Sequence, residues 1–329
     1  MSRQPTHLGI DYDKRLMLFA GRSSTELAAA IGRRLGVGVG PVRLETYANG
    51  EVYCRYEESV RGADVFLVQS LAGTRDGRLS INDALMELIL LVDAAIGASA
   101  HRVIAVIPWF GYSRQDKKSL LREPISARAV ARMLESVGVD RVLTMDLHTS
   151  QAQGFFSKPV DHMTSLAMLA ADLRARLPVD AVVAAPDAGR VKFAKKFATL
   201  LGAELAILDP ESENPRNAVI GNVRDRTVVV VDDIVDSGGT LDAAVAVLRA
   251  ADVRAIHAVA VHPVLSGDTL TRLQALGLEE ILVTDTVPVP PGAAPLVRVI
   301  PSADLLADTI HRIFTDDSVS DVFGGDNII

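Results

Sequence analysis

The sequence predicts an α/β protein made of two mainly parallel sheets, each flanked by helices. Short, β-branched apolar runs alternate with amphipathic helical stretches almost from end to end. The runs lack the strict polar alternation of half-exposed strands, which is typical of strands covered on both faces of a parallel sheet. Because 329 residues are too many for one ordinary core, we expect two domains with right-handed crossovers between their strands.

The strand-like and helix-like segments follow one another in a regular order. The predicted strands are residues 65–68, 103–107, 142–145, 181–185, 228–231, 256–261 and 281–283. The predicted helices are residues 23–35, 82–96, 125–137, 164–177, 189–201, 240–251, 266–276 and 302–314. Ser23 and Glu26 have the spacing of a capping box at the first helix, and Asn82 is a candidate N-cap for the second. A new helix begins at Thr164, so we place a domain boundary near residues 161–164.

The composition indicates a globular protein and excludes several other classes. Hydrophobic residues make up 49% of the chain and charged residues 23%, which is too apolar for a disordered chain. The net charge is −7 and no basic run stands out, so a nucleic-acid partner is not expected. Charges interrupt every long apolar stretch, so no membrane span is expected. The single cysteine, Cys54, excludes an internal disulfide. The first residues lack the apolar core of a signal peptide, and we expect a cytoplasmic protein.

The strongest chemical signal is the segment DDIVDSGGT, residues 232–240, between the strand at 228–231 and a helix. Ligands of open α/β sheets lie at the carboxyl ends of strands, and the backbone N–H groups of a helix start favour anions. Gly238 and Gly239 allow the backbone to curl closely around a phosphate. Two hydroxyl donors accompany them, Ser237 and Thr240. The segment therefore predicts a phosphate cradle.

Three carboxylates accompany this cradle, at Asp232, Asp233 and Asp236. They would repel a phosphate at close range, so they are better placed to accept hydrogen bonds from sugar hydroxyls or to order metal-bound water. A helix cap followed by solvated acids is the alternative structural interpretation. The acidic pair on an apolar strand, followed by SGGT, favours a site for a phosphorylated ribose.

Two further segments carry candidate functional residues after predicted strands. Residues 108–122 read PWFGYSRQDKKSLLR and concentrate positive charge where a polyphosphate could bind. An exposed, solvated loop would also be basic. Residues 144–156 read TMDLHTSQAQGFF, in which His148 is a candidate metal ligand or proton handler. A hydrogen-bonded structural histidine is the alternative.

Taken together, these motifs resemble a known family. The SGGT segment is similar to the signature shared by phosphoribosyltransferases and ribose-phosphate diphosphokinases, and the former share only this loop. The other segments resemble class I ribose-phosphate diphosphokinases, also called phosphoribosyl-pyrophosphate synthetases, and the resemblance runs from about residue 17 to 323. They are YANGEVYCRYEESVRGADVFLVQS (47–70), LMELILLVDA (85–94), GYSRQDKK, REPISA, TMDLHTSQAQGFF, PVDHM and APDAGRVKFAKK (185–196).

The resemblance implies two tandem phosphoribosyltransferase-type, Rossmann-like domains. Residues 1–163 would form an ATP-binding and oligomerisation domain, and residues 164–301 a ribose-phosphate-binding domain. A helix within 302–323 would pack back on the first. The implied reaction transfers the diphosphoryl group of ATP to O1 of ribose 5-phosphate, with Mg²⁺ as cofactor.

The resemblance also assigns residues on the ATP side. Tyr47, Asn49 and Glu51 match adenine-recognising positions, and in the family this strip meets the ATP site of a neighbouring subunit. A homo-oligomer is therefore implied, as dimers that assemble into hexamers. Arg114 and Gln115 match ATP-contacting positions. Arg61 and Arg122 lie where some relatives bind regulatory phosphate or ADP.

On the other side, His148 and Asp187 match positions that hold Mg²⁺ and ATP phosphates, and His148 is also a catalytic candidate. The ribose 5-phosphate positions are matched by Asp232, Asp233, Asp236, Ser237, Gly238, Gly239 and Thr240.

The chain departs from the family pattern after the strand at 204–208. Family members carry a mobile loop that begins Lys-x-Arg, whose cations close over the transferring phosphates. Here Pro210 and Ser212 occupy those positions, and Arg216 is the nearest cation and a catalytic candidate. Three interpretations stay open: a working enzyme in which Arg216, Lys192 or Lys195 replaces the usual cations, a weakly active regulatory paralogue, or a diphosphotransferase for another acceptor.

Overall fold

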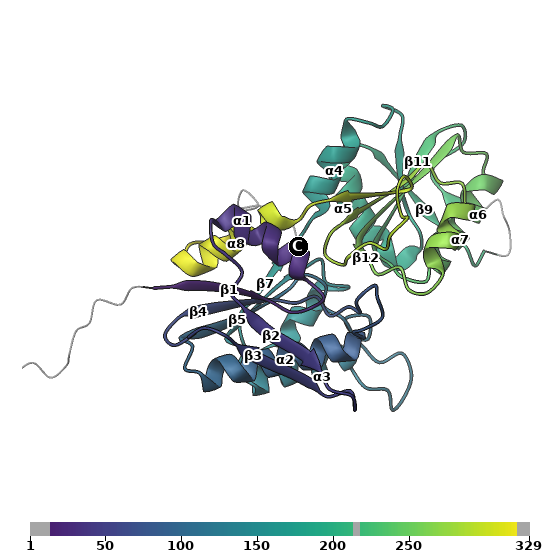
Figure 1. The fold of residues 1–329 in the computed structure, drawn as a ribbon. Helices are drawn as coiled ribbons and strands as arrows, with labels where there is room; N and C mark the ends of the chain where they lie inside the picture. Colours follow the sequence, from purple (N-terminus) through teal and green to yellow (C-terminus); the bar gives the residue numbers. More distant parts are fainter. Residues whose placement is uncertain (1–13, 213–217, 321–329) are drawn as a thin grey trace, which may run out of the picture.

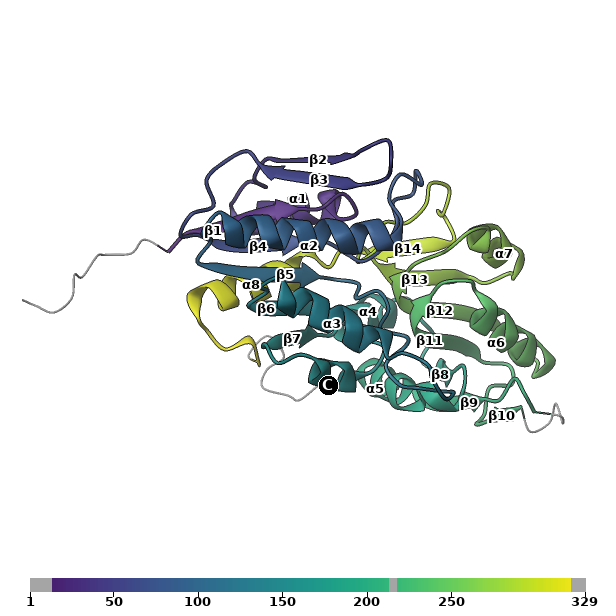
Figure 2. The same cartoon turned by 90° about the horizontal axis from the view of Figure 1, so that it is seen from below.

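The computed structural model describes residues 14–212 and 218–320, which form two sheets with helices on both faces of each (Figures 1 and 2). The prediction of an α/β fold with mainly parallel sheets is confirmed. Within these residues, no helix combines the length and the hydropathy that a bilayer span requires.

The first sheet has the strand order β1-β4-β5-β6-β7, and all neighbouring strands are parallel. Its strands are β1 (Leu16–Ala20), β4 (Asp64–Val68), β5 (Arg102–Ile107), β6 (Arg141–Met145) and β7 (Val160–Met163). Its helices are α1 (Thr25–Leu35), α2 (Ile81–Gly97), α3 (Ser126–Ser136), the short η1 (Ser150–Phe155) and α8 (Ala303–Thr315). Alternate residues of a strand face opposite ways. Phe66 therefore packs with α1 and α8, whereas Val65 and Leu67 pack with α2 and α3.

A separate antiparallel hairpin, β2 (Val42–Thr46) and β3 (Val52–Tyr56), lies beside α2. Figure 2 shows it above the first sheet. The hydroxyl of Tyr56 donates to the carbonyl of Leu91 at 2.8 Å, which joins the hairpin to α2.

The second sheet has the order β10-β9-β8-β11-β12-β13-β14, and only the pairing of β10 with β9 is antiparallel among its described strands. Its strands are β8 (Val182–Ala185), β9 (Glu204–Leu208), β10 (Val219–Ile220), β11 (Thr227–Val235), β12 (Ala255–Pro263), β13 (Glu280–Thr284) and β14 (Val297–Ile300). The helices α4 (Leu166–Arg174) and α5 (Val191–Leu201), with the short η2 (Ala188–Arg190) before α5, lie on one face, and α6 (Gly239–Ala250) and α7 (Thr269–Ala275) on the other. After β14 the chain returns to the first sheet, where Leu306 and Ile310 of α8 join its core.

Several local predictions are wrong. Ser23 does not cap α1: Ser24 is the N-cap, without a side-chain hydrogen bond, and the Ser23 hydroxyl donates instead to Ser70 O at 2.6 Å. Asn82 does not cap α2, because Ser80 does so in a capping box with Asp83. The Ser24 hydroxyl instead accepts from Ser70 N at 2.8 Å, a tertiary contact, whereas the partner of Ser80 lies in the first turn of α2.

The carboxyl ends of the two sheets meet along a seam. Trp109, which follows β5, packs with Ala72 and Val287, and its ring centre lies 4.5 Å from that of His262 at the end of β12. His262 is fully buried, and its Nε2 lies 3.1 Å from the backbone carbonyl of Asp146 after β6. These contacts hold the carboxyl ends of β5 and β6 in the first sheet next to the carboxyl end of β12 in the second.

A buried carboxylate at the opposite end of the first sheet provides a stability test. Asp64 is fully buried, and its oxygens lie 2.5 Å from Arg102 Nη2 and 2.7 Å from His101 Nδ1. Burial alone would raise the pKa of Asp64, but these hydrogen bonds outweigh it and lower the pKa. Replacing Asp64 by Asn is expected to lower the free energy of unfolding at pH 7 by about 3 kcal/mol, because Arg102 loses its buried partner.

The pH dependence of this difference follows from the lowered pKa. The ionised carboxylate stabilises the folded state above its unfolded pKa of about 3.9, and the contribution is lost as the pH falls through the folded value. Urea unfolding of wild type and Asp64→Asn should therefore differ by a constant amount above about pH 5 and converge below about pH 4. Asp304→Asn is the control, because its ion pair with Arg34 is exposed on both sides and contributes under about 1 kcal/mol.

Candidate active site

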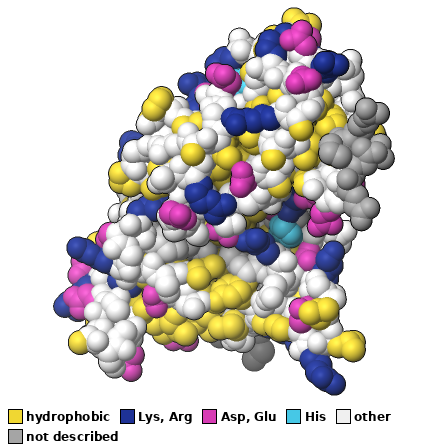
Figure 3. Space-filling model, turned by 90° about the vertical axis from the view of Figure 1, so that its right-hand side faces the viewer, with side chains coloured by type: hydrophobic (Ala, Val, Ile, Leu, Met, Phe, Trp, Pro, Cys, Tyr) yellow, Lys and Arg dark blue, Asp and Glu magenta, His cyan; other side chains and the backbone are white. Residues whose placement is uncertain are grey.

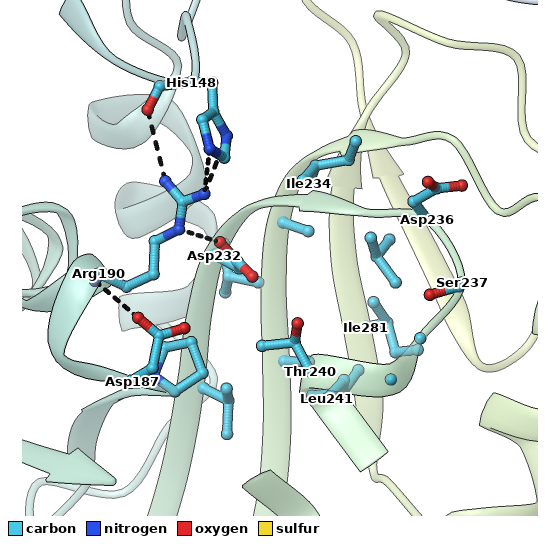
Figure 4. Close-up of a pocket in the computed structure, with 18 of the residues that line it drawn as sticks. His148, Asp187, Arg190, Asp232, Ile234, Asp236, Ser237, Thr240, Leu241 and Ile281 are labelled. Atoms are coloured by element: carbon cyan, nitrogen blue, oxygen red, sulfur yellow. Dashed lines mark hydrogen bonds and ion pairs between the residues drawn. The ribbon is translucent and has the colours of Figure 1, made fainter. Parts of the chain in front are cut away.

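A pocket opens at the carboxyl end of β11, where the chain turns into α6 (Figure 4). Gly238 is the N-cap of α6 and has a φ of +78°. A Cβ at this position would lie 3.3 Å from side-chain carbons of Thr269 and Leu273. Glycine adopts this left-handed backbone conformation with little strain. The first N–H groups of α6, which have no partner within the helix, lie at the end of the helix that borders the pocket.

Most of the predicted site residues line this pocket. They are Arg114, His148, Asp187, Asp232, Asp236, Ser237, Gly238, Gly239 and Thr240. On the face drawn in Figure 3, acidic, basic and histidine side chains gather in the hollow between the two parts of the molecule. One prediction about this segment is wrong: Asp232 and Asp233 belong to β11, which continues to Val235, and do not start a loop. The parallel pairing of Asp232 with Ala260 of β12 extends the strand.

His148, Arg190 and the acidic pair form a connected charged cluster. His148 Nδ1 lies 2.8 Å from Asp233 Oδ2. Arg190 Nε lies 2.9 Å from Asp232 Oδ1, and its Nη2 lies 3.0 Å from Asp233 Oδ1. Because a carboxylate only accepts hydrogen bonds, the Nδ1 proton of His148 points at Asp233. Arg190 Nη2 lies 2.9 Å from His148 Nδ1 and 3.2 Å from its Nε2, so the guanidinium lies against the imidazole ring.

The two neighbouring carboxylates hold different pKa values. Burial, followed by the charge of Asp233, raises the pKa of Asp232 well above its ordinary value. Burial also acts to raise the pKa of Asp233, but the hydrogen bond from His148 and the charge of Arg190 outweigh it and lower the pKa to about 2. Of the two side chains, Asp233 is therefore the one that stays ionised. Its carboxylate holds His148 and Arg190 in place.

Arg114 joins the first sheet to the phosphate cradle. It follows β5 in the predicted ATP-binding segment, and its Nη1 lies 2.6 Å from Asp236 Oδ2. Gln115 does not line the pocket, and its amide oxygen accepts from the hydroxyl of Ser126. The contact between Arg114 and Asp236 brings the two predicted substrate segments to one place.

The donors that could hold Mg²⁺ are few. Asp187 lies at the end of β8, and its Oδ1 accepts from the backbone N–H groups of Gly189 (2.7 Å) and Arg190 (3.2 Å). No cluster of three or more His, Cys, Asp or Glu side chains forms a metal site within the described ranges. Mg²⁺ commonly takes one or two carboxylates and completes its shell with water and substrate phosphates. The second oxygen of Asp187 fits such a partial shell, and His148 lines the same pocket.

Other candidates lie away from this pocket. Tyr47 and Glu51 stand at the exposed tip of the β2–β3 hairpin, where Tyr47 N donates to Glu51 O at 2.8 Å and Glu51 N to the side chain of Asn49 at 3.2 Å. Arg61 and Arg122 are exposed as well. None of the five lines the pocket.

The altered loop is described only in part. Pro210 and Ser212 lie in a turn after β9, closed by a hydrogen bond from Ser212 N to Asp209 O. Arg216 lies outside the described residues, so its role stays a prediction. Lys192 and Lys195 are exposed on α5 and do not line the pocket.

Arg190 is the site residue that the sequence interpretation missed. It lies in the segment APDAGRVKFAKK, three residues after the predicted metal ligand Asp187, so a cation at a strand's carboxyl end was the available signal. Its two acidic partners are distant in sequence, on β11, and only the fold brings them together.

Two family models match the chain. The N-terminal domain of ribose phosphate pyrophosphokinase matches residues 16–138, and the phosphoribosyl synthetase-associated domain matches residues 209–324. A ribose-phosphate pyrophosphokinase from Corynebacterium efficiens is 43% identical over 95% of this chain and 97% of its own length. The chain belongs to the ribose-phosphate pyrophosphokinase family.

Other members of the ribose-phosphate pyrophosphokinase family agree with this assignment. The protein of that name from Gloeobacter violaceus is 41% identical, with 94% of each chain covered. The crystal structure of phosphoribosylpyrophosphate synthetase from Mycobacterium smegmatis superposes with a TM-score of 0.85 at 40% identity, and covers 92% of this chain and 100% of its own. The predicted family and fold are thus confirmed.

Proposed function

We propose that the protein transfers the β,γ-diphosphoryl group of ATP to O1 of ribose 5-phosphate and releases AMP, and that it does so in the cytoplasm. The observation that carries this proposal is the contact of Arg114, in the ATP-type segment, with Asp236 in the phosphate cradle. A phosphate in the cradle and a polyphosphate beside Arg114 would then meet at the seam between the sheets.

The cradle supplies binding and orientation of the sugar phosphate. The N–H groups at the start of α6 and the hydroxyls of Ser237 and Thr240 are suited to the 5-phosphate. The carboxylate of Asp232 lines the pocket and is suited to the ribose hydroxyls. Asp233, which was predicted to share this role, is buried behind it and contacts His148 and Arg190 instead. Sugar O1 then attacks the β-phosphorus as the bond from that phosphorus to the AMP oxygen breaks. In such a transfer positioning and charge stabilisation dominate the rate.

We assign Asp187 and His148 to Mg²⁺ and the ATP phosphates. When bound, Mg²⁺ would neutralise and polarise the phosphates. The Asp233 carboxylate holds the Nδ1 proton of His148, so the Nε2 lone pair is available to a metal or a phosphate proton. Arg190 Nη2 lies 3.2 Å from that nitrogen, so a ligand bound there would also lie close to the guanidinium.

We further propose that residues 1–163 form the ATP-binding and oligomerisation domain and residues 164–301 the ribose-phosphate domain. Tyr47, Asn49 and Glu51 would complete the ATP site of a neighbouring subunit, because they stand exposed at a hairpin tip away from the pocket of their own chain. Dimers assembled into hexamers are the expected form.

The sequence of the loop after β9 is the reason for two alternative functions. Cations that stabilise the transition state are each worth ~3–4 kcal/mol, and Pro210 and Ser212 cannot supply them. In the proposed enzyme Arg216 takes this role. A regulatory paralogue would bind both substrates without turnover, and a diphosphotransferase for another acceptor would turn over a different sugar phosphate.

AMP release from ATP, Mg²⁺ and ribose 5-phosphate tests the proposal. We expect AMP to form only when all three are present, and chelation of Mg²⁺ with EDTA to abolish it. Binding of both substrates with AMP at background would support the regulatory alternative. AMP release with another sugar phosphate, and not with ribose 5-phosphate, would support the third.

A further inference from the structure

A compact loop, residues 73–80, projects from the first sheet before α2. It is closed by its own hydrogen bonds: Thr74 N donates to Leu79 O at 2.9 Å, and Leu79 N donates to the Thr74 hydroxyl at 3.0 Å. The Thr74 hydroxyl in turn donates to Asp76 at 2.7 Å. These bonds fix the loop and therefore the starting point of the Arg75 side chain.

Arg75 reaches from this loop to the second sheet. Its Nη2 donates to Pro263 O at 2.9 Å, and its Nη1 donates to Val264 O at 2.8 Å and contacts Leu265 O at 3.5 Å. Its Nε donates to Pro288 O at 2.5 Å. Within the described ranges no carboxylate pairs with Arg75. The planar guanidinium instead donates its hydrogen bonds to backbone carbonyls of the second sheet and its loops.

The carbonyls that Arg75 holds belong to the segment that supports the phosphate cradle. Residues 263–266 run from the last residue of β12 into the loop that follows it. Leu265 N donates to Val235 O at 3.0 Å, and Ser266 N donates to Asp236 O at 3.2 Å. Asp236 is also held from the first sheet by Arg114. The start of the cradle is therefore tied to the first sheet by Arg114 directly and by Arg75 through residues 263–266.

We propose that Arg75 is a positioning residue that holds the ribose 5-phosphate cradle in register with the ATP side of the site. This inference rests on the proposed function for its consequence, but the link from Arg75 to the cradle is a property of the free protein. All three nitrogens of the Arg75 guanidinium already contact carbonyls, so Arg75 acts through the backbone and does not contact the substrate.

Hydrogen exchange of the ligand-free full chain tests the link without any substrate. In Arg75→Met the amides of Leu265 and Ser266 should exchange roughly tenfold faster, the loss expected for one hydrogen bond to a charged group. Arg78→Met is the matched control: Arg78 lies in the same loop, and its side chain is largely exposed and pairs with Asp76. Equal exchange in wild type and Arg75→Met would overturn the proposal.

Kinetics test the consequence for the site. Arg75→Met should raise the KM for ribose 5-phosphate by roughly tenfold, change the KM for ATP by less than about twofold, and leave Arg78→Met like wild type. Arg75→Lys should restore part of the loss, because it keeps the charge without the fork. If Arg75→Met does not fold, the exchange and kinetic measurements are made on Arg75→Lys instead.

The remaining outcomes are distinguishable. Equal rises in the KM values of both substrates would indicate a general loosening and overturn the positioning role. A wild-type protein that neither binds ribose 5-phosphate nor releases AMP would overturn the proposed function, and the exchange rates alone would then decide whether Arg75 holds residues 263–266.

Discussion

Replacing Asp233 by asparagine is expected to lower kcat for diphosphoryl transfer by about 10²- to 10³-fold. Asp233 is 1% exposed and accepts a hydrogen bond from Nδ1 of His148, while its other oxygen lies 3.0 Å from Arg190. An amide carries no charge and would leave Arg190 short of one buried partner. Removing one pre-oriented group that stabilises the transition state costs about 10²- to 10³-fold in kcat, or about 2.7–4 kcal/mol in the barrier.

The effect should be confined to the site. His148 would lose the orientation that Asp233 gives it, so kcat should fall even at saturating ATP and ribose 5-phosphate. Asp242→Asn is the matched control, since Asp242 is an exposed carboxylate on the first turn of α6. Retention of kcat within about threefold by a folded Asp233→Asn variant would contradict the assigned role of the cluster.

Gly238→Val is expected to weaken ribose 5-phosphate binding by about 100-fold or more. The residue has a φ of +78°, and a Cβ alone would already lie 3.3 Å from carbons of Thr269 and Leu273. A β-branched side chain adds two methyl groups to that contact and disfavours the left-handed backbone. The start of α6 would have to shift, and with it the N–H groups proposed to bind the phosphate. Titration calorimetry with ribose 5-phosphate measures the change.

Gly202→Val separates the backbone cost from the loss of the cradle. Gly202 ends α5 with a φ of +76°, and nothing lies within 4 Å of a Cβ built there. Both variants should lose stability, but only Gly238→Val should lose affinity for ribose 5-phosphate. Similar affinities in the two variants would show that the α6 turn does not bind the phosphate.

The fold class and the glycine turn at the start of α6 could be predicted because their signals are local. The β-branched runs of buried parallel strands and the sequence DSGGT after such a run each lie within a short segment. The position of the strand end was harder to predict. Asp232 and Asp233 are polar, yet they continue β11. β12 offers ladder partners on one side, Arg190 pairs with both carboxylates, and His148 hydrogen-bonds to Asp233.

Contacts between distant segments could not be predicted from local pattern. Arg190 pairs with residues more than forty positions away, and Arg75 contacts carbonyls on the far side of the seam. Ser23 has the spacing of a helix cap but donates to the end of β4, which outweighs the local motif. Such choices depend on how the two sheets meet, which no single stretch of sequence encodes.

The most direct test of the account is to follow the fate of the sugar carbon that receives the diphosphate. Ribose 5-phosphate labelled with ¹³C at C1 is incubated with ATP, Mg²⁺ and the full chain, and carbon and phosphorus NMR are recorded together. The account predicts that the C1 resonance acquires a coupling to phosphorus, with one AMP formed for each coupled C1. Binding of both substrates without such a coupling, or transfer of a single phosphate with release of ADP, would contradict it.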